Sequence, residues 1–151
     1  MSAENTASPN GSSSGDSTGP LRVLVYSDDR NTRDKVKFGI GKRPERDLPP
    51  VEFLECATQP AVLKALDAGG IDVVILDGEA VPAGGMGLAR QLKDEIFHCP
   101  PILVLTGRVQ DAWLATWSRA DAAVPYPLDP VALCRTTVTL ARKRLAASSA
   151  R

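Results

Sequence analysis

The stretch that decides the fold is Asp72-Val73-Val74-Ile75-Leu76-Asp77, an apolar run that ends at a carboxylate. Apolar runs at 21–26 and 102–105 have the same form, and polar residues follow them at 27–29 and 106–107. Short continuous apolar runs are typical of strands that are buried on both faces of a parallel sheet. The carboxyl ends of such strands meet at the edge where ligands bind, so we expect the polar residues to lie together there. Carboxylates and a hydroxyl in one place suit a hard cation such as Mg²⁺ and a phosphoryl group.

Composition and patterning predict one folded domain with polar ends. The chain has 151 residues, of which 43% are hydrophobic and 24% are charged, and these proportions permit a packed core. Residues 1–19 are almost entirely Ser, Gly, Asn, Thr and Ala, and they carry too few apolar side chains to offset the entropy of ordering. We therefore expect a disordered tail at 1–19, a folded domain at 20–146 and a second disordered tail at 147–151.

Charge, cysteine usage and hydropathy exclude several classes of function. The formal net charge is zero, from 18 basic and 18 acidic side chains, which argues against a nucleic-acid partner. The cysteines are Cys56, Cys99 and Cys134, and their odd number and scattered spacing favour reduced, structural thiols in a cytoplasmic protein. No apolar run approaches the ~18 residues needed to cross a bilayer, so we expect no membrane insertion.

Strand and helix patterns alternate along the folded domain. We expect strands at 21–26, 51–56, 71–76, 102–105 and 122–124. We expect helices at 32–40, from a cap at Thr58 to Gly69, at 87–97, at 111–119, and from a cap at Asp129 with Pro130 in its first turn. Five strands that alternate with helices indicate an α/β fold, a doubly wound five-stranded parallel sheet covered on both faces.

The order of the polar residues resembles that of a response-regulator receiver domain, the flavodoxin-like (βα)5 module of bacterial two-component (phosphorelay) signalling. The resemblance covers about Pro20 to Leu145. It rests on the acidic residues after the first strand, on Asp77, on Thr106-Gly107 and on the run from Tyr126 to Pro130. It implies a sheet with the strand order 2-1-3-4-5.

The resemblance implies a phosphorylation site at the carboxyl edge of the sheet. Asp77 would accept a phosphoryl group from a histidine kinase. An acidic pocket would hold Mg²⁺ weakly, with Asp28, Asp77 and the backbone carbonyl of Glu79 among its members. The alignment leaves two choices for the acidic pair of this pocket, either Asp28 with Asp29 or Ser27 with Asp28.

Two departures from the family pattern fall in the residues of its switch. Thr106 matches the hydroxyl that contacts the phosphoryl group, but Tyr126 stands where the family has a lysine. A phenol is neutral at pH 7, and losing a charge-assisted hydrogen bond costs about 1.5–3 kcal/mol. Ala123 stands where the family usually has an aromatic residue, so Thr106 lacks its usual partner. These residues therefore indicate an atypical receiver.

A partner surface is expected from three residues near the end of the domain. In receivers, the face made by the fourth helix, the fifth strand and the fifth helix is the usual site of output contacts. Trp117, Arg119 and Tyr126 fall there, and these residue types are enriched at interface hot spots. We therefore expect the partner to be another protein or a protein complex.

The sequence leads to one main functional hypothesis and two alternatives. We expect no output domain after residue 151, and we interpret the chain as a stand-alone atypical receiver that binds proteins, is not an enzyme, and depends little on phosphorylation. One alternative is a conventional single-domain response regulator that a histidine kinase phosphorylates on Asp77. A remote alternative is a small aspartyl-phosphate phosphatase, which needs a second aspartate two residues after the first as acid and base, where this chain has Glu79.

Overall fold

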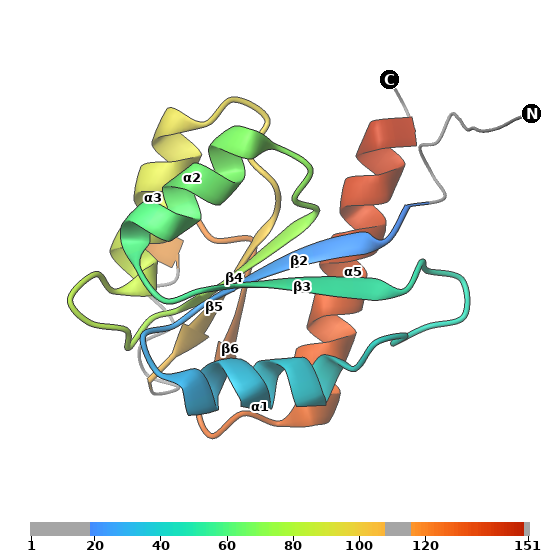
Figure 1. Ribbon diagram of the computed structural model, residues 1–151, viewed down its shortest axis with the longest axis horizontal. Helices are drawn as coiled ribbons and strands as arrows, with labels where there is room; N and C mark the ends of the chain where they lie inside the picture. The colour runs from blue at the N-terminus through green and yellow to red at the C-terminus, as the bar shows by residue number, and fades with distance from the viewer. Residues whose placement is uncertain (1–18, 108–115, 150–151) are drawn as a thin grey trace, which may run out of the picture.

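Five parallel strands form one sheet at the centre of the molecule (Figure 1). The computed structural model describes residues 19–107 and 116–149. The strands are β2 (Leu21–Tyr26), β3 (Val51–Cys56), β4 (Val73–Asp77), β5 (Ile102–Thr106) and β6 (Ala122–Pro125). They lie in the order β3-β2-β4-β5-β6, so the predicted α/β fold and the strand order 2-1-3-4-5 are confirmed.

Helices cover both faces of this sheet. The described helices are α1 (Arg30–Ile40), α2 (Gln59–Ala68), α3 (Gly85–Glu95) and α5 (Pro130–Ser149). Figure 1 shows α1 and α5 on one face and α2 and α3 on the other. Successive residues of a strand point to opposite faces. Along β2, Val23 and Val25 therefore pack in the core beside α1 and α5. Leu24 and Tyr26 pack in the second core, beside α2 and α3.

Polar caps begin the helices where the sequence predicted them. Thr58 Oγ1 accepts a hydrogen bond from the backbone N–H of Ala61 at 3.3 Å, and Asp129 Oδ1 accepts one from the N–H of Val131 at 3.1 Å. Each bond satisfies a donor that has no partner inside the first turn of a helix. The caps predicted at Thr58 and Asp129 are confirmed.

A glycine sets the close packing of α1 on α5. A Cβ atom at Gly39 would lie 3.3 Å from Leu133 Cδ2 and 3.5 Å from Pro130 Cα. A larger residue at position 39 would push the two helices apart. The two helices are therefore held together by a packing contact that only a small residue permits.

Some predicted boundaries are wrong by two or three residues. The third strand begins at Val73 and not at 71, because Asp72 is held by Arg22: its carboxylate accepts from the Arg22 N–H at 2.9 Å, and its own N–H donates to the Arg22 carbonyl at 2.8 Å. Helix α3 begins and ends two residues earlier than predicted. Helix α5 continues to Ser149, so the domain does not end at 146 and residues 147–149 are not a disordered tail.

Two predictions fall on residues that the structure does not describe. The polar tail at 1–19 lies outside the described residues except for Gly19, and most of the helix predicted at 111–119 lies outside them as well. Within the described ranges, no helix is long and apolar enough to cross a membrane.

Candidate functional site

Asp77 lies at the carboxyl end of the central strand. It is the last residue of β4, which pairs with β2 on one side and β5 on the other. Its side chain sits in the interior of the molecule, since the residue is only 4% exposed. A buried carboxylate needs hydrogen-bond donors for its oxygens.

Three neutral donors satisfy the Asp77 carboxylate. Oδ2 accepts a hydrogen bond from the Ser27 hydroxyl at 2.7 Å. Oδ1 accepts one from the Tyr126 hydroxyl at 2.8 Å and one from the backbone N–H of Glu79 at 2.9 Å. None of these donors carries a positive charge. The carboxylate is therefore stabilised by dipoles from β2, from the β4–α3 loop and from the segment after β6.

Tyr126 is fixed both by its backbone and by its side chain. Its N–H donates to the Thr106 carbonyl at 2.8 Å, which continues the pairing of β5 with β6. Burial raises the pKa of the Tyr126 phenol well above its usual value, and the hydrogen bond and charge of Asp77 raise it further. The phenol therefore keeps its proton and remains a donor to Asp77.

The structure separates Tyr126 from the other two residues of the predicted partner surface. Tyr126 was placed on a partner surface with Trp117 and Arg119, but its hydroxyl is bonded to Asp77 inside the site. Trp117 and Arg119 are exposed and lie against α3: Arg90 donates to the Trp117 carbonyl at 2.7 Å, and Arg119 pairs with Asp94. Tyr126 and Trp117 thus belong to different parts of the molecule.

Ser27, and not Asp29, stands beside Asp77. Tyr26 is paired with Leu76, so Ser27 follows β2 at the level at which Asp77 ends β4, and Ser27 is fully buried. Asp29 caps α1 instead, and its carboxylate accepts from the Asn31 N–H at 2.9 Å. The assignment of Asp29 to the acidic pocket is therefore wrong, because the start of α1 uses that carboxylate.

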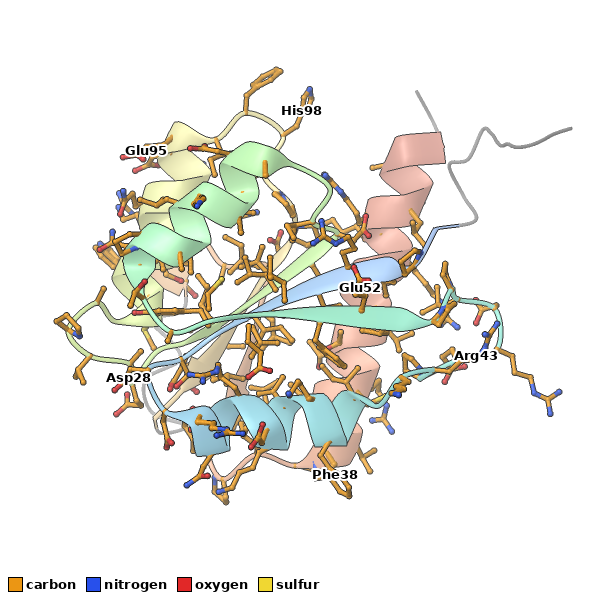
Figure 2. The ribbon with its side chains drawn as sticks, viewed as in Figure 1. Asp28, Phe38, Arg43, Glu52, Glu95 and His98 are labelled. Carbon is orange, nitrogen blue, oxygen red and sulfur yellow. The ribbon has the colours of Figure 1, made fainter. Side chains whose placement is uncertain are left out.

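Asp28 holds the loop that follows β4. Its Oδ1 accepts from the Val81 N–H at 3.1 Å, and Figure 2 shows it at the edge of the sheet beside this loop. The Tyr26 hydroxyl donates to the Ala83 carbonyl at 2.6 Å and fastens the same loop from within. Burial raises the pKa of the Tyr26 phenol, and the negative charges of Asp28 and Asp77 raise it further, so the phenol keeps its proton and remains a donor to Ala83.

Glu79 covers the site from the side of β5. A Cβ atom at Gly107 would lie 2.6 Å from Glu79 Oε2, so the carboxylate rests directly on the backbone of this glycine. The charge of Glu79 also contributes to the raised pKa of Tyr126. A side chain at position 107 would therefore require the Glu79 carboxylate to move.

Thr106 and Ala123 occupy the places that the sequence predicted. Thr106 ends β5 and is 3% exposed, while Ala123 lies in β6 opposite Val104 and is exposed. No aromatic side chain at position 123 covers Thr106. The role of Thr106 as a switch hydroxyl stays a prediction.

The fold is the receiver fold, as similar solved structures show. The receiver domain of the Francisella response regulator 1452 aligns with a TM-score of 0.69 at 16% identity, over 82% of this chain and 98% of that chain. The signal receiver domain of an HD domain-containing protein from Pseudomonas fluorescens Pf-5 aligns with a TM-score of 0.73 at 13% identity, over 87% of this chain and 94% of that chain. At these identities the likeness shows the fold alone.

A sequence relative shows the family. An uncharacterized response regulatory protein of Mycobacterium tuberculosis is 59% identical over 127 residues, which cover 84% of this chain and 96% of the relative. No protein-family model matches the chain. The chain belongs to the response regulators of two-component signalling, and its receiver domain is of the kind that interacts with kinases and other proteins.

Receiver domains typically bind Mg²⁺ at the phosphorylation site, and here the acidic side chains that would hold the ion already accept hydrogen bonds. Ser27 replaces one carboxylate, Asp28 is bonded to the amide of Val81, and Asp77 accepts three hydrogen bonds. In the described part of the chain, no three acidic, His or Cys side chains are grouped so that they could hold a metal ion. Mg²⁺ in proteins is usually held by one or two carboxylates together with water, so Asp28 and Asp77 would have to release the hydrogen bonds that they accept before they could bind the ion.

Proposed function

We propose that this response regulator is an atypical receiver that acts as a protein-binding module, as a standing subunit of a larger cytoplasmic protein complex. Its binding depends little or not at all on phosphorylation of Asp77, and it has no catalytic activity of its own. The observation that carries the proposal is the hydrogen bond of 2.8 Å from the Tyr126 hydroxyl to Asp77.

The proposal rests first on the reactivity of Asp77. Phosphorylation requires a free carboxylate oxygen to attack phosphorus, and both oxygens here accept hydrogen bonds from buried or half-buried groups. A hydrogen bond to the attacking oxygen lowers its electron density and must be broken or bent before attack. Asp77 is therefore a weaker nucleophile than a carboxylate whose attacking oxygen accepts no fixed hydrogen bond.

The proposal rests also on the charge of the site. Phosphoryl transfer is accelerated mainly by positive charge that stabilises the transferring group. Tyr126 stays neutral, and Glu79 and Asp28 are carboxylates. No described side chain that contacts Asp77 is a cation. A dianionic phosphoryl donor is therefore repelled by this site and is not held there.

One observation favours the conventional switch as a second candidate. Asp77 and Thr106 end adjacent strands, since β4 pairs with β5 and Asp77 lies opposite Leu105. An acceptor and a hydroxyl at neighbouring strand ends are the minimum that a phosphorylation switch needs. A histidine kinase that tolerates Tyr126 would then be the partner.

Treatment of the full chain with acetyl phosphate, followed by intact-mass measurement, separates the two candidates. We expect little or no phosphoryl adduct on the unmodified protein. Tyr126→Lys restores the missing cation and should raise labelling by about 10-fold or more, because a charge-assisted hydrogen bond is worth about 1.5–3 kcal/mol. Tyr126→Phe serves as the matched control, since it removes the same hydroxyl without adding charge.

One outcome of the same experiment would contradict the proposal. A strong adduct on the unmodified chain that disappears in Asp77→Asn would establish the conventional switch. An adduct that appears only in Tyr126→Lys would show that the tyrosine alone silences the site.

A further inference from the structure

An exposed phenylalanine stands on α1, between two hollows of the surface. Phe38 is 88% exposed, and Figure 2 shows it on the side of α1 that faces away from the sheet. The first hollow, of about 590 Å³, lies between Phe38 and the segment that leads from β6 into α5. The second, of about 670 Å³, lies between Phe38 and Phe53 of β3.

The first hollow is mostly apolar and reaches the Asp77 site. Phe38, Leu128, Pro130 and Leu133 line it, and Lys35 is the one charged residue among the described residues of its lining. Tyr126 also lines it, so the residue that bonds Asp77 on the inside forms part of the wall on the outside. A hollow of this composition accepts an apolar side chain, and an anionic group beside that side chain would meet Lys35.

The surrounding chain is strongly basic although the protein is neutral overall. Residues 30–46 carry seven Lys and Arg against two Asp and Glu. Glu55 pairs with Arg33 at 3.0 Å and with Lys37 at 2.7 Å. Within the described residues, Lys35 and Lys42, one beside each hollow, form no ion pair. Positive charge therefore remains on both sides of Phe38.

We propose that the Phe38 surface, formed by Lys35, Phe38, Lys42, Leu128 and Pro130, docks an acidic segment of a partner protein. An apolar side chain of that segment fills the hollow between Phe38 and Pro130, and its flanking carboxylates face Lys35 and Lys42. The inference rests on the proposed function, since it gives the binding module its surface and the chemistry of its partner.

Other occupants fit this surface less well. A second copy of the chain would bring the same positive charge against itself across a two-fold axis. A nucleic acid is held by several phosphate contacts at once, whereas the described lining of the first hollow is mostly apolar and includes one lysine. An acidic protein segment with an apolar anchor satisfies both the hollow and the charge.

The helices that form the hollow are anchored in the core, which favours binding. Val36 and Ile40 anchor α1 in the core, and Gly39 allows Leu133 of α5 to approach α1 closely. A preformed hollow needs little ordering when a partner binds. Phe38 is thus an exposed side chain on α1, whose opposite face is buried in the core.

The test selects peptides from a displayed library of random dodecapeptides on the full chain, without a phosphoryl donor. We expect the recovered peptides to be acidic and to share a large apolar residue. The best peptide is then synthesised and its affinity is measured by fluorescence anisotropy. Phe38→Ala and, independently, Lys35→Glu should each weaken binding by about 10-fold or more.

Two matched controls are available in the chain. Phe97 is 87% exposed after α3, and Lys64 is exposed on α2, both away from the Phe38 surface. Phe97→Ala and Lys64→Glu should change binding less than about 2-fold. Circular dichroism of each variant checks that the overall helical content is unchanged.

Several outcomes would overturn the inference. Recovery of basic or neutral peptides would do so, as would binding that ignores both Phe38→Ala and Lys35→Glu, or a stronger Phe38-dependent affinity for a single-stranded oligonucleotide. Binding that needs Phe38 but occurs only after treatment with acetyl phosphate supports the surface and refutes the independence from phosphorylation. The two proposals can therefore fail separately.

Discussion

Asp77 and Asp121 are carboxylates at opposite ends of the same sheet, and their surroundings differ in one respect. Asp77, at the carboxyl end of β4, accepts hydrogen bonds from two hydroxyls and one amide. Asp121, just before β6, accepts from Lys93 Nζ at 2.7 Å and from the Ile102 N–H at 2.7 Å, with Lys143 Nζ at 3.7 Å. The first carboxylate has only neutral partners, and the second has cations.

The difference shows that Asp121, and not Asp77, is the carboxylate of this pair that has lysine partners. The family pattern places a lysine–carboxylate pair at the phosphorylation site, but here Lys93 pairs with Asp121 at the far end of the sheet. There Lys93 of α3 and Lys143 of α5 are attached to the loop before β6. At Asp121 the cations serve the packing of helices on the sheet, whereas at Asp77 no cation is left for an incoming anion.

The largest effect is expected from Asp77→Asn. The Asp77 carboxylate has two acceptor oxygens for three donors, whereas an asparagine amide has one acceptor oxygen. The NH₂ group of the asparagine would face a hydroxyl that now donates to the carboxylate. Buried donors without partners each cost about 1–3 kcal/mol, so we expect the free energy of unfolding to fall by about 3 kcal/mol in urea titrations. A gain in stability would mean that repulsion among carboxylates dominates the site.

A smaller loss is expected from Tyr126→Phe, which removes only the hydroxyl. A hydrogen bond to a charged acceptor contributes about 1.5–3 kcal/mol, so we expect a loss of about 2 kcal/mol. Tyr26→Phe is the matched control, because that hydroxyl donates to the neutral Ala83 carbonyl. Its loss should be about 1 kcal/mol. Equal losses in the two variants would show that the Asp77 charge adds nothing to the Tyr126 bond.

Asp121→Asn should cost less than either change at Asp77 or Tyr126. The side chains of Asp121 and Lys93 are 18% and 17% exposed, so water screens part of their attraction. Asparagine also keeps an acceptor for Ile102. We expect a loss of about 1 kcal/mol that shrinks at high salt. The exposed pair of Asp47 with Arg142 supplies the control, and Asp47→Asn should have no measurable effect.

The smallest expected effect is a change in how steeply the free energy of unfolding depends on pH in Asp121→Asn. Burial opposes the ionised form of Asp121, but the hydrogen bonds of Lys93 and Ile102 outweigh it and lower the pKa below 3.8. The folded protein thus binds this proton less readily than the unfolded chain, so the stabilisation is present above 3.8 and is lost as pH falls through the folded pKa. We expect Asp121→Asn to lose less stability than the unmodified protein between about pH 5 and pH 2. If the free energies of unfolding of the two proteins fell in parallel with pH, the lowered pKa of Asp121 would be contradicted.

Local patterns were sufficient to predict most of the fold. Each strand was recognised because a short apolar run has to be buried on both faces, and Thr58 and Asp129 were recognised as caps from their residue types. The boundary errors have local causes that pattern alone does not reveal. Asp72 is polar and bonded to Arg22, which keeps residues 71–72 out of the strand.

The strand ends that carry the candidate site were predicted, but the contacts of its side chains were not. The positions of Asp77, Thr106 and Tyr126 followed from the strand ends. The sequence could not decide whether Ser27 or Asp29 lies beside Asp77. A carboxylate suits both the N-cap of a helix and an acidic pocket, and only the register of β2 with β4 distinguishes the two positions. The bond from Tyr126 to Asp77 joins residues 49 apart in sequence and depends on a side-chain conformation. The Phe38 surface was missed because α1 was judged by its few core residues and not by its outer face.

The Tyr126–Asp77 bond has a consequence for how this protein could carry information. Neither hydroxyl nor amide partner of Asp77 changes its protonation at cellular pH, since burial keeps the pKa of Tyr126 well above the ordinary range. A site without a second state of comparable free energy cannot report the arrival of a ligand. Under our proposal, the remaining variable is the number of copies in the cell. Such a protein would set the stoichiometry of an assembly through its own synthesis and turnover, because its abundance would vary while the state of its site would not.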